Sequence, residues 1–138
     1  MNQSAPKESH PSLFIASDHA GFDLKERIKT LLPNVTWIDL GPTDSSRVDY
    51  PDFADRVAAR VQSGGRGVLI CGSGQGMAMR ANRYKGVRAA LVWNEEITKL
   101  SREHNDANII CLGARFLTSA SAWAGSSAGM MPSSFEHI

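Results

Sequence analysis

The sequence predicts an α/β protein in which helices cover both faces of a five-stranded parallel sheet. Short apolar segments alternate along the chain with segments whose apolar residues recur at helical spacing, as in βαβ units. The apolar segments are continuous, which is typical of strands buried on both faces. With 138 residues, of which 42% are hydrophobic, the chain has the size and composition of one globular domain.

Two strand–helix pairs are predicted in the first half of the chain. The apolar run 13–16 is the first expected strand, and the helix after it should end before Pro33, because proline cannot continue a helix. Residues 35–38 are the second expected strand. After a polar loop, Asp52 is the expected N-cap of a helix with an apolar face formed by Phe53, Val57 and Val61.

Glycines separate the elements in the middle of the chain. Gly64 and Gly65 should end the preceding helix, and the strand predicted over 67–71 leads into the glycine-rich loop 72–76. We expect a short helix over 77–83.

The last two strands are predicted over 87–92 and 109–112, with a helix between them. Asn94 is a suitable N-cap for that helix. Glu95 and Glu96 would lie in its first turn, where negative charge opposes the helix dipole favourably.

Composition and charge exclude several classes of protein. Fifteen Lys and Arg residues against fourteen Asp and Glu give a net charge of +1, which argues against a nucleic-acid or membrane partner. No apolar segment approaches the ~20 residues of a transmembrane helix. Residues 1–11 are expected to be a disordered polar extension rather than a secretory signal. Two cysteines are too few for a disulfide framework, so we expect a cytoplasmic protein.

The loops beyond the carboxyl ends of the strands are the candidate site, because ligands of open parallel sheets bind there. Polar and reactive side chains gather in or near these loops: Asp18, His19, Tyr50, Cys71, Asn94, Glu95, His104, Asn105 and Arg115. The loop before the fifth strand, which carries His104 and Asn105, is expected at the same edge as the loops that follow the strands.

The glycine loop is the strongest single feature. Gly72, Gly74 and Gly76 recur at every second position between a strand and a helix, and such a loop directs several backbone N–H groups toward one point. That geometry binds a phosphate or stabilises a developing oxyanion. A tight turn without a ligand would produce the same pattern.

Cys71 directly precedes this loop. A cysteine at a helix N-terminus can have a lowered pKa and act as a base or nucleophile, but free cysteines are most often small buried apolar residues, so both interpretations stay open. Cys111 lies inside an apolar run and is expected to be a core residue. The pairs Asp18–His19 and His104–Asn105 offer acid–base groups, or else loop caps.

Four motifs occur together in an order that is specific to one family. They are residues 17–22 (SDHAGF), 49–52 (DYPD), 70–76 (ICGSGQG) and 101–108 (SREHNDAN). The set closely resembles the type B ribose-5-phosphate isomerases, relatives of galactose-6-phosphate isomerase, over about residues 13–117.

The resemblance implies a Rossmann-like three-layer α/β/α sandwich that forms a homodimer or a dimer of dimers, with active sites at the subunit interface and neither metal nor other cofactor. It implies interconversion of ribose 5-phosphate and ribulose 5-phosphate through an enediolate. Cys71 resembles the base that moves the proton. Some members use a glutamate in the following loop, where this chain has Gln75, which cannot act as a base.

The same resemblance implies the remaining roles. The N–H groups of Gly72 to Gly76 and the Ser73 hydroxyl would stabilise the enediolate oxygen. His104, paired with Asp18, resembles the group that opens the furanose ring. The residues that would bind substrate are Asn105 and Tyr50 for sugar hydroxyls and His19 and Arg115 for phosphate.

The C-terminal part departs from the family pattern. Relatives usually carry a long helix and a Phe-Glu-Gly-Gly-Arg-His segment with a further arginine, and these basic side chains help to hold the phosphate. Here no Lys or Arg follows Arg115, and residues 118–138 are an atypical segment of low charge. The predicted isomerase domain is therefore 12–117, with a phosphate site formed chiefly by His19 and Arg115.

Three alternatives stay open. A related isomerase could act on galactose 6-phosphate or allose 6-phosphate. A nucleotide-binding module would use Glu95 as its ribose-binding acid, but the Gly-x-Gly-x-Gly spacing differs from Gly-x-Gly-x-x-Gly, and Asp18, His19 and His104 would have no role. A catalytically impaired paralogue would retain the motifs with a degraded C-terminus.

Overall fold

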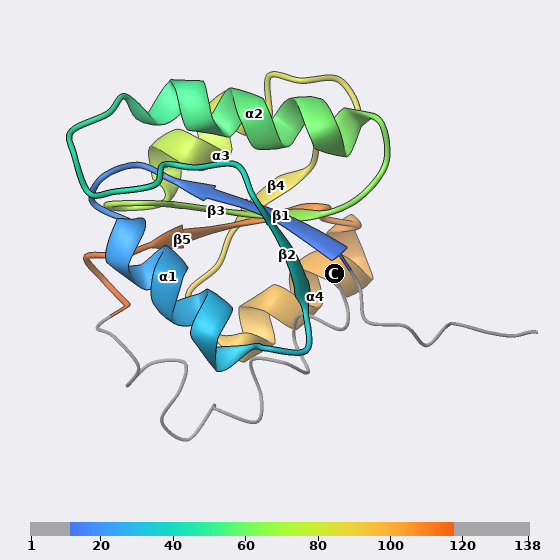
Figure 1. Ribbon diagram of the computed structural model, residues 1–138. Coiled ribbons are helices and arrows are strands. Elements are labelled where there is room, and N and C mark those ends of the chain that lie inside the picture. Colours follow the sequence, from blue (N-terminus) through green and yellow to red (C-terminus); the bar gives the residue numbers. More distant parts are fainter. Residues whose placement is uncertain (1–11, 118–138) are drawn as a thin grey trace, which may run out of the picture.

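The computed structural model describes residues 12–117, in which five strands and four helices alternate along the chain (Figure 1). In order these are β1 (Ser12–Ser17), α1 (Phe22–Leu31), β2 (Thr36–Asp39), α2 (Tyr50–Gln62), β3 (Gly67–Cys71), α3 (Gln75–Ala81), β4 (Ala89–Leu91), α4 (Glu95–Asn105) and β5 (Ile109–Gly113). The predictions for residues 1–11 and 118–138 lie outside the described residues.

The five strands form one parallel sheet in the order β2-β1-β3-β5-β4. Ser17 pairs with Ile70 and Cys71 pairs with Gly113, so β1, β3 and β5 end nearly level. We call this end of the sheet the carboxyl edge and the opposite end the amino edge. β2 and β3 pair with opposite sides of β1. The boundary between β1 and β3 is therefore the switch point, where ligands bind in such sheets.

Helices cover both faces of the sheet: α2 and α3 lie above it in Figure 1, and α1 and α4 lie below. Side chains alternate between the faces along a strand. Val68 and Ile70 of β3 therefore belong to the core between the sheet and helices α1 and α4. Leu69 and Cys71 belong to the core between the sheet and helices α2 and α3. The predicted three-layer Rossmann-like sandwich is confirmed.

Helix boundaries agree with the sequence except at the start of α2 and at α3, which spans Gln75–Ala81 rather than the expected 77–83. Asn94 caps α4, since its side chain accepts the Ile97 N–H at 2.8 Å. The N-cap prediction for Asp52 is wrong: α2 begins at Tyr50, the N-cap residue is Asp49, and Asp52 lies in the first turn. The reason is Pro51, because proline fits the first turn of a helix, where its missing N–H is not needed.

Candidate active site

Hydrogen bonds join the loops after β1 and β5 to the end of β3 at the carboxyl edge. The Asp18 N–H donates to the Ile70 carbonyl at 3.0 Å, and the Ala114 N–H donates to the Cys71 carbonyl at 2.8 Å. Asp18 and Cys71, which are 53 positions apart by number, are thereby brought to one edge of the sheet, as the sequence predicts.

The glycine loop turns its N–H groups away from β5. The carbonyls of Cys71 and Gly72 accept the N–H groups of Ala114 and Arg115 at 2.8 Å and 3.0 Å. Because the N–H and C=O of a trans peptide point in opposite directions, the N–H groups of Gly72 and Ser73 point away from β5. This arrangement offers donors for an anionic oxygen at the carboxyl edge.

Close packing explains why glycine is needed at two positions of the loop. Gly74 has a φ of +80°, and a Cβ there would lie 2.6 Å from Leu91 Cδ1 and 2.9 Å from the Leu112 carbonyl carbon. A Cβ on Gly76 would lie 2.7 Å from the Tyr50 ring. The absence of a side chain at position 76 therefore lets Tyr50, the first residue of α2, pack directly on the loop.

Two charged or reactive groups lie against this loop. The Cys71 side chain is 5% exposed, and its sulfur accepts the Gly74 N–H at 3.1 Å. This contact fixes the position of the sulfur at the start of the glycine loop. The Arg115 guanidinium lies on the other side, 3.2 Å from where a Cβ of Gly72 would be.

Cys111 has the opposite environment. It is fully buried, and burial, with a smaller contribution from the nearby Cys71, raises the pKa of its thiol. The prediction that Cys111 is a core residue is confirmed, and the two cysteines have different surroundings although they lie on neighbouring strands.

The loop after β1 presents Asp18 and His19. The Asp18 carboxylate is 8% exposed and accepts the Gly21 N–H at 2.9 Å, which stabilises the turn into α1. His19 Nδ1 lies 3.2 Å from the Val48 carbonyl oxygen and 3.3 Å from the Val48 nitrogen. The backbone of the loop after β2 therefore orients the imidazole. Sequence analysis missed Val48 because only its backbone takes part.

His104 and Asn105 lie at the amino edge, so the expectation that they join the other loops is wrong within one chain. The Asn105 carbonyl accepts from Arg88 Nε at 2.6 Å, just before β4, and the nearby Asn108 carbonyl accepts the N–H of Gly67, the first residue of β3. β3 separates this point from Cys71 by roughly 13 Å at the usual rise per residue. Residues that precede a strand lie at its amino end, whatever their sequence distance from the site.

A cavity of about 240 Å³ adjoins the glycine loop at the carboxyl edge. Ser73 and Gln75 line one side, and its other lining residues are Leu91, Val92, Trp93, Gly113, Phe116 and Leu117. Trp93 and Phe116 are 55% and 74% exposed. Sequence analysis did not single out these two aromatic residues.

Among residues 12–117, no group of three or more His, Cys, Asp or Glu side chains is placed to hold a metal ion. No helix in the same range has the length and apolar character needed to cross a membrane.

The carboxyl edge therefore brings together a cysteine, backbone N–H donors, a histidine and an arginine, and the class of protein is the sugar-phosphate isomerases. Residues 13–128 match the model of the Ribose/Galactose Isomerase family, and the chain belongs to this family.

Individual relatives agree with the family assignment. The chain is 48% identical over 115 residues to a probable ribose-5-phosphate isomerase B of Mycoplasma genitalium, with 78% of this chain and 74% of the relative covered. It is 42% identical over 102 residues to ribose-5-phosphate isomerase B of Escherichia coli, with 71% and 68% covered.

Solved structures show the same fold. The crystal structure of a Thermotoga maritima ribose 5-phosphate isomerase superimposes with a TM-score of 0.81 at 38% identity, covering 92% of this chain and 86% of that one. The Mycoplasma genitalium enzyme with bound ribulose-5-phosphate gives 0.76 at 39% identity, covering 91% and 81%.

Proposed function

We propose that this protein interconverts ribose 5-phosphate and ribulose 5-phosphate through an enediolate, with Cys71 as the base. The names of the relatives and the ribulose-5-phosphate bound in the Mycoplasma genitalium structure support the choice of substrate. The observation that carries the mechanism is the 3.1 Å contact from the Gly74 N–H to the Cys71 sulfur, beside N–H groups that point away from β5.

Cys71 can act as the base and then as the acid for both proton transfers at carbon. The Cys71 thiolate removes the proton from C2 of the open-chain aldose, the C–H electrons form the C1=C2 bond, and the carbonyl electrons move onto O1. The N–H groups of Gly72, Ser73 and Gly76 and the Ser73 hydroxyl stabilise the negative oxygen, whereas the N–H groups of Gly74 and Gln75 donate to Cys71 Sγ and Ser73 Oγ. Removing one donor to such an oxygen typically costs about 3 kcal/mol of barrier. The Cys71 thiol then returns the proton to C1, while the O2 proton passes to O1 and C2 becomes the carbonyl.

The substrate-binding residues come from both edges of the sheet. His19 and Arg115 bind the phosphate, and Tyr50 holds a sugar hydroxyl, all from the carboxyl edge. His104, which opens the furanose ring, and Asn105 lie at the amino edge of the same chain, next to Arg88. We infer that a second copy supplies them, so that Asp18 of one protomer pairs with His104 of its partner in a homodimer with two shared sites.

A direct assay tests the proposal. The full chain is incubated with ribose 5-phosphate, and ribulose 5-phosphate is measured over time; galactose 6-phosphate and allose 6-phosphate serve as comparison substrates. We expect the highest kcat/KM for ribose 5-phosphate, with solvent deuterium appearing at C1 of the product. Absence of pentose turnover, or a higher kcat/KM for a hexose phosphate, would contradict the proposal.

A further inference from the structure

We propose that Lys25, a buried residue outside the site described above, is a positioning residue for the phosphate end of that site. Its ammonium group holds the turn after β2, and the loop that continues from this turn orients His19. The inference rests on the proposed function in one respect only, the role of His19 as a phosphate ligand.

Lys25 is fully buried on α1. Its Nζ donates to Asp39 Oδ2 at 2.6 Å, to the Pro42 carbonyl at 2.9 Å and to Glu26 Oε2 at 3.0 Å. The ammonium group has three protons, so each has an acceptor. Burying a lysine is unfavourable unless its charge is paired and hydrogen-bonded, and here both conditions are met at the end of β2.

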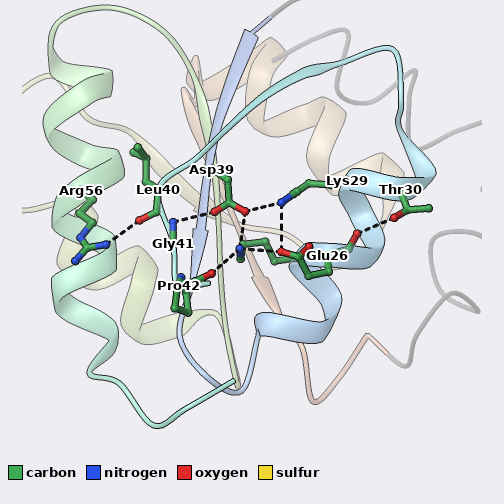
Figure 2. Close-up of polar contacts among 9 residues, drawn as sticks. Glu26, Lys29, Thr30, Asp39, Leu40, Gly41, Pro42 and Arg56 are labelled. Atoms are coloured by element: carbon green, nitrogen blue, oxygen red, sulfur yellow. Dashed lines mark hydrogen bonds and ion pairs between the residues drawn. The ribbon is translucent and has the colours of Figure 1, made fainter. Parts of the chain in front are cut away.

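Contacts from α2, β1 and α1 hold the turn 40–42, and Figure 2 shows those made by Leu40 and Pro42. The Leu40 carbonyl accepts from Arg56 of α2 at 2.9 Å, the Gly41 carbonyl accepts the Ser17 N–H of β1 at 3.1 Å, and the Pro42 carbonyl accepts from Lys25. The Gly41 N–H also donates to Asp39 Oδ1 at 2.8 Å. Lys25 is the donor that α1 contributes to this turn.

Two contacts link the segment after β2 to the segment that carries His19. The Gly41 carbonyl holds Ser17, two residues before His19, and Val48, at the far end of the loop, holds His19 Nδ1 at 3.2 Å and 3.3 Å. Within residues 12–117 these contacts engage only Nδ1, so Nε2 is the nitrogen that would meet a phosphate oxygen. Cys71 lies on β3, and its sulfur is held by Gly74 rather than by this segment. Release of the turn should therefore weaken phosphate binding more than it slows proton transfer.

Lys29 provides a matched control. Its Nζ donates to the same two carboxylate oxygens, Asp39 Oδ2 at 2.6 Å and Glu26 Oε2 at 3.3 Å, and no contact links it to Pro42. Lys25→Met and Lys29→Met remove the same charge and the same carboxylate partners, but only Lys25→Met releases the Pro42 carbonyl.

We expect Lys25→Met to raise KM for ribose 5-phosphate about tenfold, the effect of losing one hydrogen bond to a charged group, with kcat changed less than about threefold. Lys29→Met should leave both constants within about twofold of wild type. Equal effects of the two variants, or a fall in kcat with unchanged KM, would overturn the proposal.

Arg56→Met keeps the inference testable if Lys25→Met does not fold. It releases the Leu40 carbonyl of the same turn from the opposite face, and we expect KM to rise about threefold with kcat retained. An unchanged KM in a folded Arg56→Met protein would overturn the proposal.

A measurement without turnover separates this inference from the proposed function. The ¹⁵N shifts of the His19 imidazole are recorded in the full chain, alone and during titration with inorganic phosphate. We expect altered His19 shifts and weaker phosphate binding in Lys25→Met but not in Lys29→Met. Unaltered shifts in Lys25→Met overturn the positioning role, whereas an inactive wild-type chain with the expected shifts overturns only the isomerase proposal.

Discussion

Cys71 and Cys111 lie on adjacent parallel strands, and position along the strand decides what each thiol can do. Cys71 is the last residue of β3, so its side chain meets the loop that follows and accepts the Gly74 N–H. Cys111 is the middle residue of β5, where burial raises its pKa and keeps the thiol protonated. A base for proton transfer must lie within reach of the substrate. Cys71 lies beside the glycine loop at the carboxyl edge, whereas Cys111 lies inside the sheet.

Replacement of the two cysteines should therefore have opposite consequences. Cys71→Ala is expected to lower kcat by about 10²–10⁴-fold, the usual contribution of general-base catalysis, while sugar-phosphate binding and the fold are retained. Cys111→Ala is expected to keep kcat and to lose about 1 kcal/mol of stability to the small cavity it leaves. Steady-state kinetics and urea unfolding of both variants measure this contrast, and wild-type-like turnover by Cys71→Ala would exclude the thiolate mechanism.

Position 74 in the loop between β3 and α3 requires glycine for two reasons, its left-handed φ and its close packing. A comparison with Gly86 separates the two effects. Gly74 and Gly86 have similar left-handed φ values, +80° and +84°, but only Gly74 is crowded: a Cβ there would overlap Leu91 and the backbone of β5, whereas nothing lies within 4 Å at Gly86. Gly86→Ala should cost only the conformational strain, about 1–2 kcal/mol.

Gly74→Ala should cost the same strain plus the overlap with β5, a further ~1–3 kcal/mol, and it should displace the N–H that contacts Cys71. We expect a larger fall in the free energy of unfolding than for Gly86→Ala and a loss of most isomerase activity. Urea unfolding and activity assays of the two variants test this. Equal stabilities with full activity in both would show that the loop adapts to a side chain.

At the scale of elements, the sequence patterns predict nearly all strands and helices because local signals set them. Pro33 and Asn94 mark helix ends by their own chemistry, and Pro51 accounts for the one wrong N-cap. Partners far apart in sequence are harder to predict. Lys25 looks like a solvent-exposed charge next to an apolar helix face, and it is buried only because Asp39 and the Pro42 carbonyl, contributed by the following strand and turn, lie against it.

The candidate site shows the same limit. Asp18, His19 and the glycine loop are predictable because they directly follow strands, and Tyr50 is predictable because it lies near the end of the polar loop after the second strand. The Val48 backbone contact to His19 spans 29 positions and leaves no side-chain signal. His104 is part of a recognisable motif, but its place at the amino edge depends on β5 entering the sheet parallel to β3, which the motif does not encode.

For the whole molecule, the ion pairs around Asp39 predict how stability depends on pH. Burial by itself would raise the pKa of Asp39, but hydrogen bonds from Lys25 and Lys29 outweigh it and lower the pKa below its usual 3.8. A group with a lower pKa in the folded state stabilises the protein above its unfolded pKa, and this contribution is lost as pH falls through the folded pKa.

We therefore expect the free energy of unfolding to fall steeply below about pH 4. Asp39→Asn should be less stable than wild type at neutral pH and lose less stability on acidification, because it has no carboxylate to protonate. Urea unfolding between neutral and acidic pH measures both curves. Parallel curves for wild type and Asp39→Asn would show that other carboxylates dominate the acid response.

Cys71 and His104 lie at opposite edges of the sheet in one chain, and this predicts how dimers of two different variants should behave. If each site takes Cys71 from one copy and His104 from another, Cys71→Ala and His104→Ala damage different halves of the same site. A mixed dimer then holds one site with both defects and one site with neither. Random exchange of protomers makes half of the dimers mixed, so about a quarter of all sites should be intact in an equimolar mixture.

Activity should thus rise after the two variants are mixed under conditions that allow protomers to exchange, well above the mean of the separate proteins. Sedimentation of wild type and of both variants verifies that the dimer forms in each case. A mixture of wild type with Cys71→Ala provides the control, because exchange leaves its number of intact sites unchanged. A mixture of the two variants that stays at their mean, despite demonstrated exchange, would place both residues in the site of one chain and contradict the shared-site arrangement.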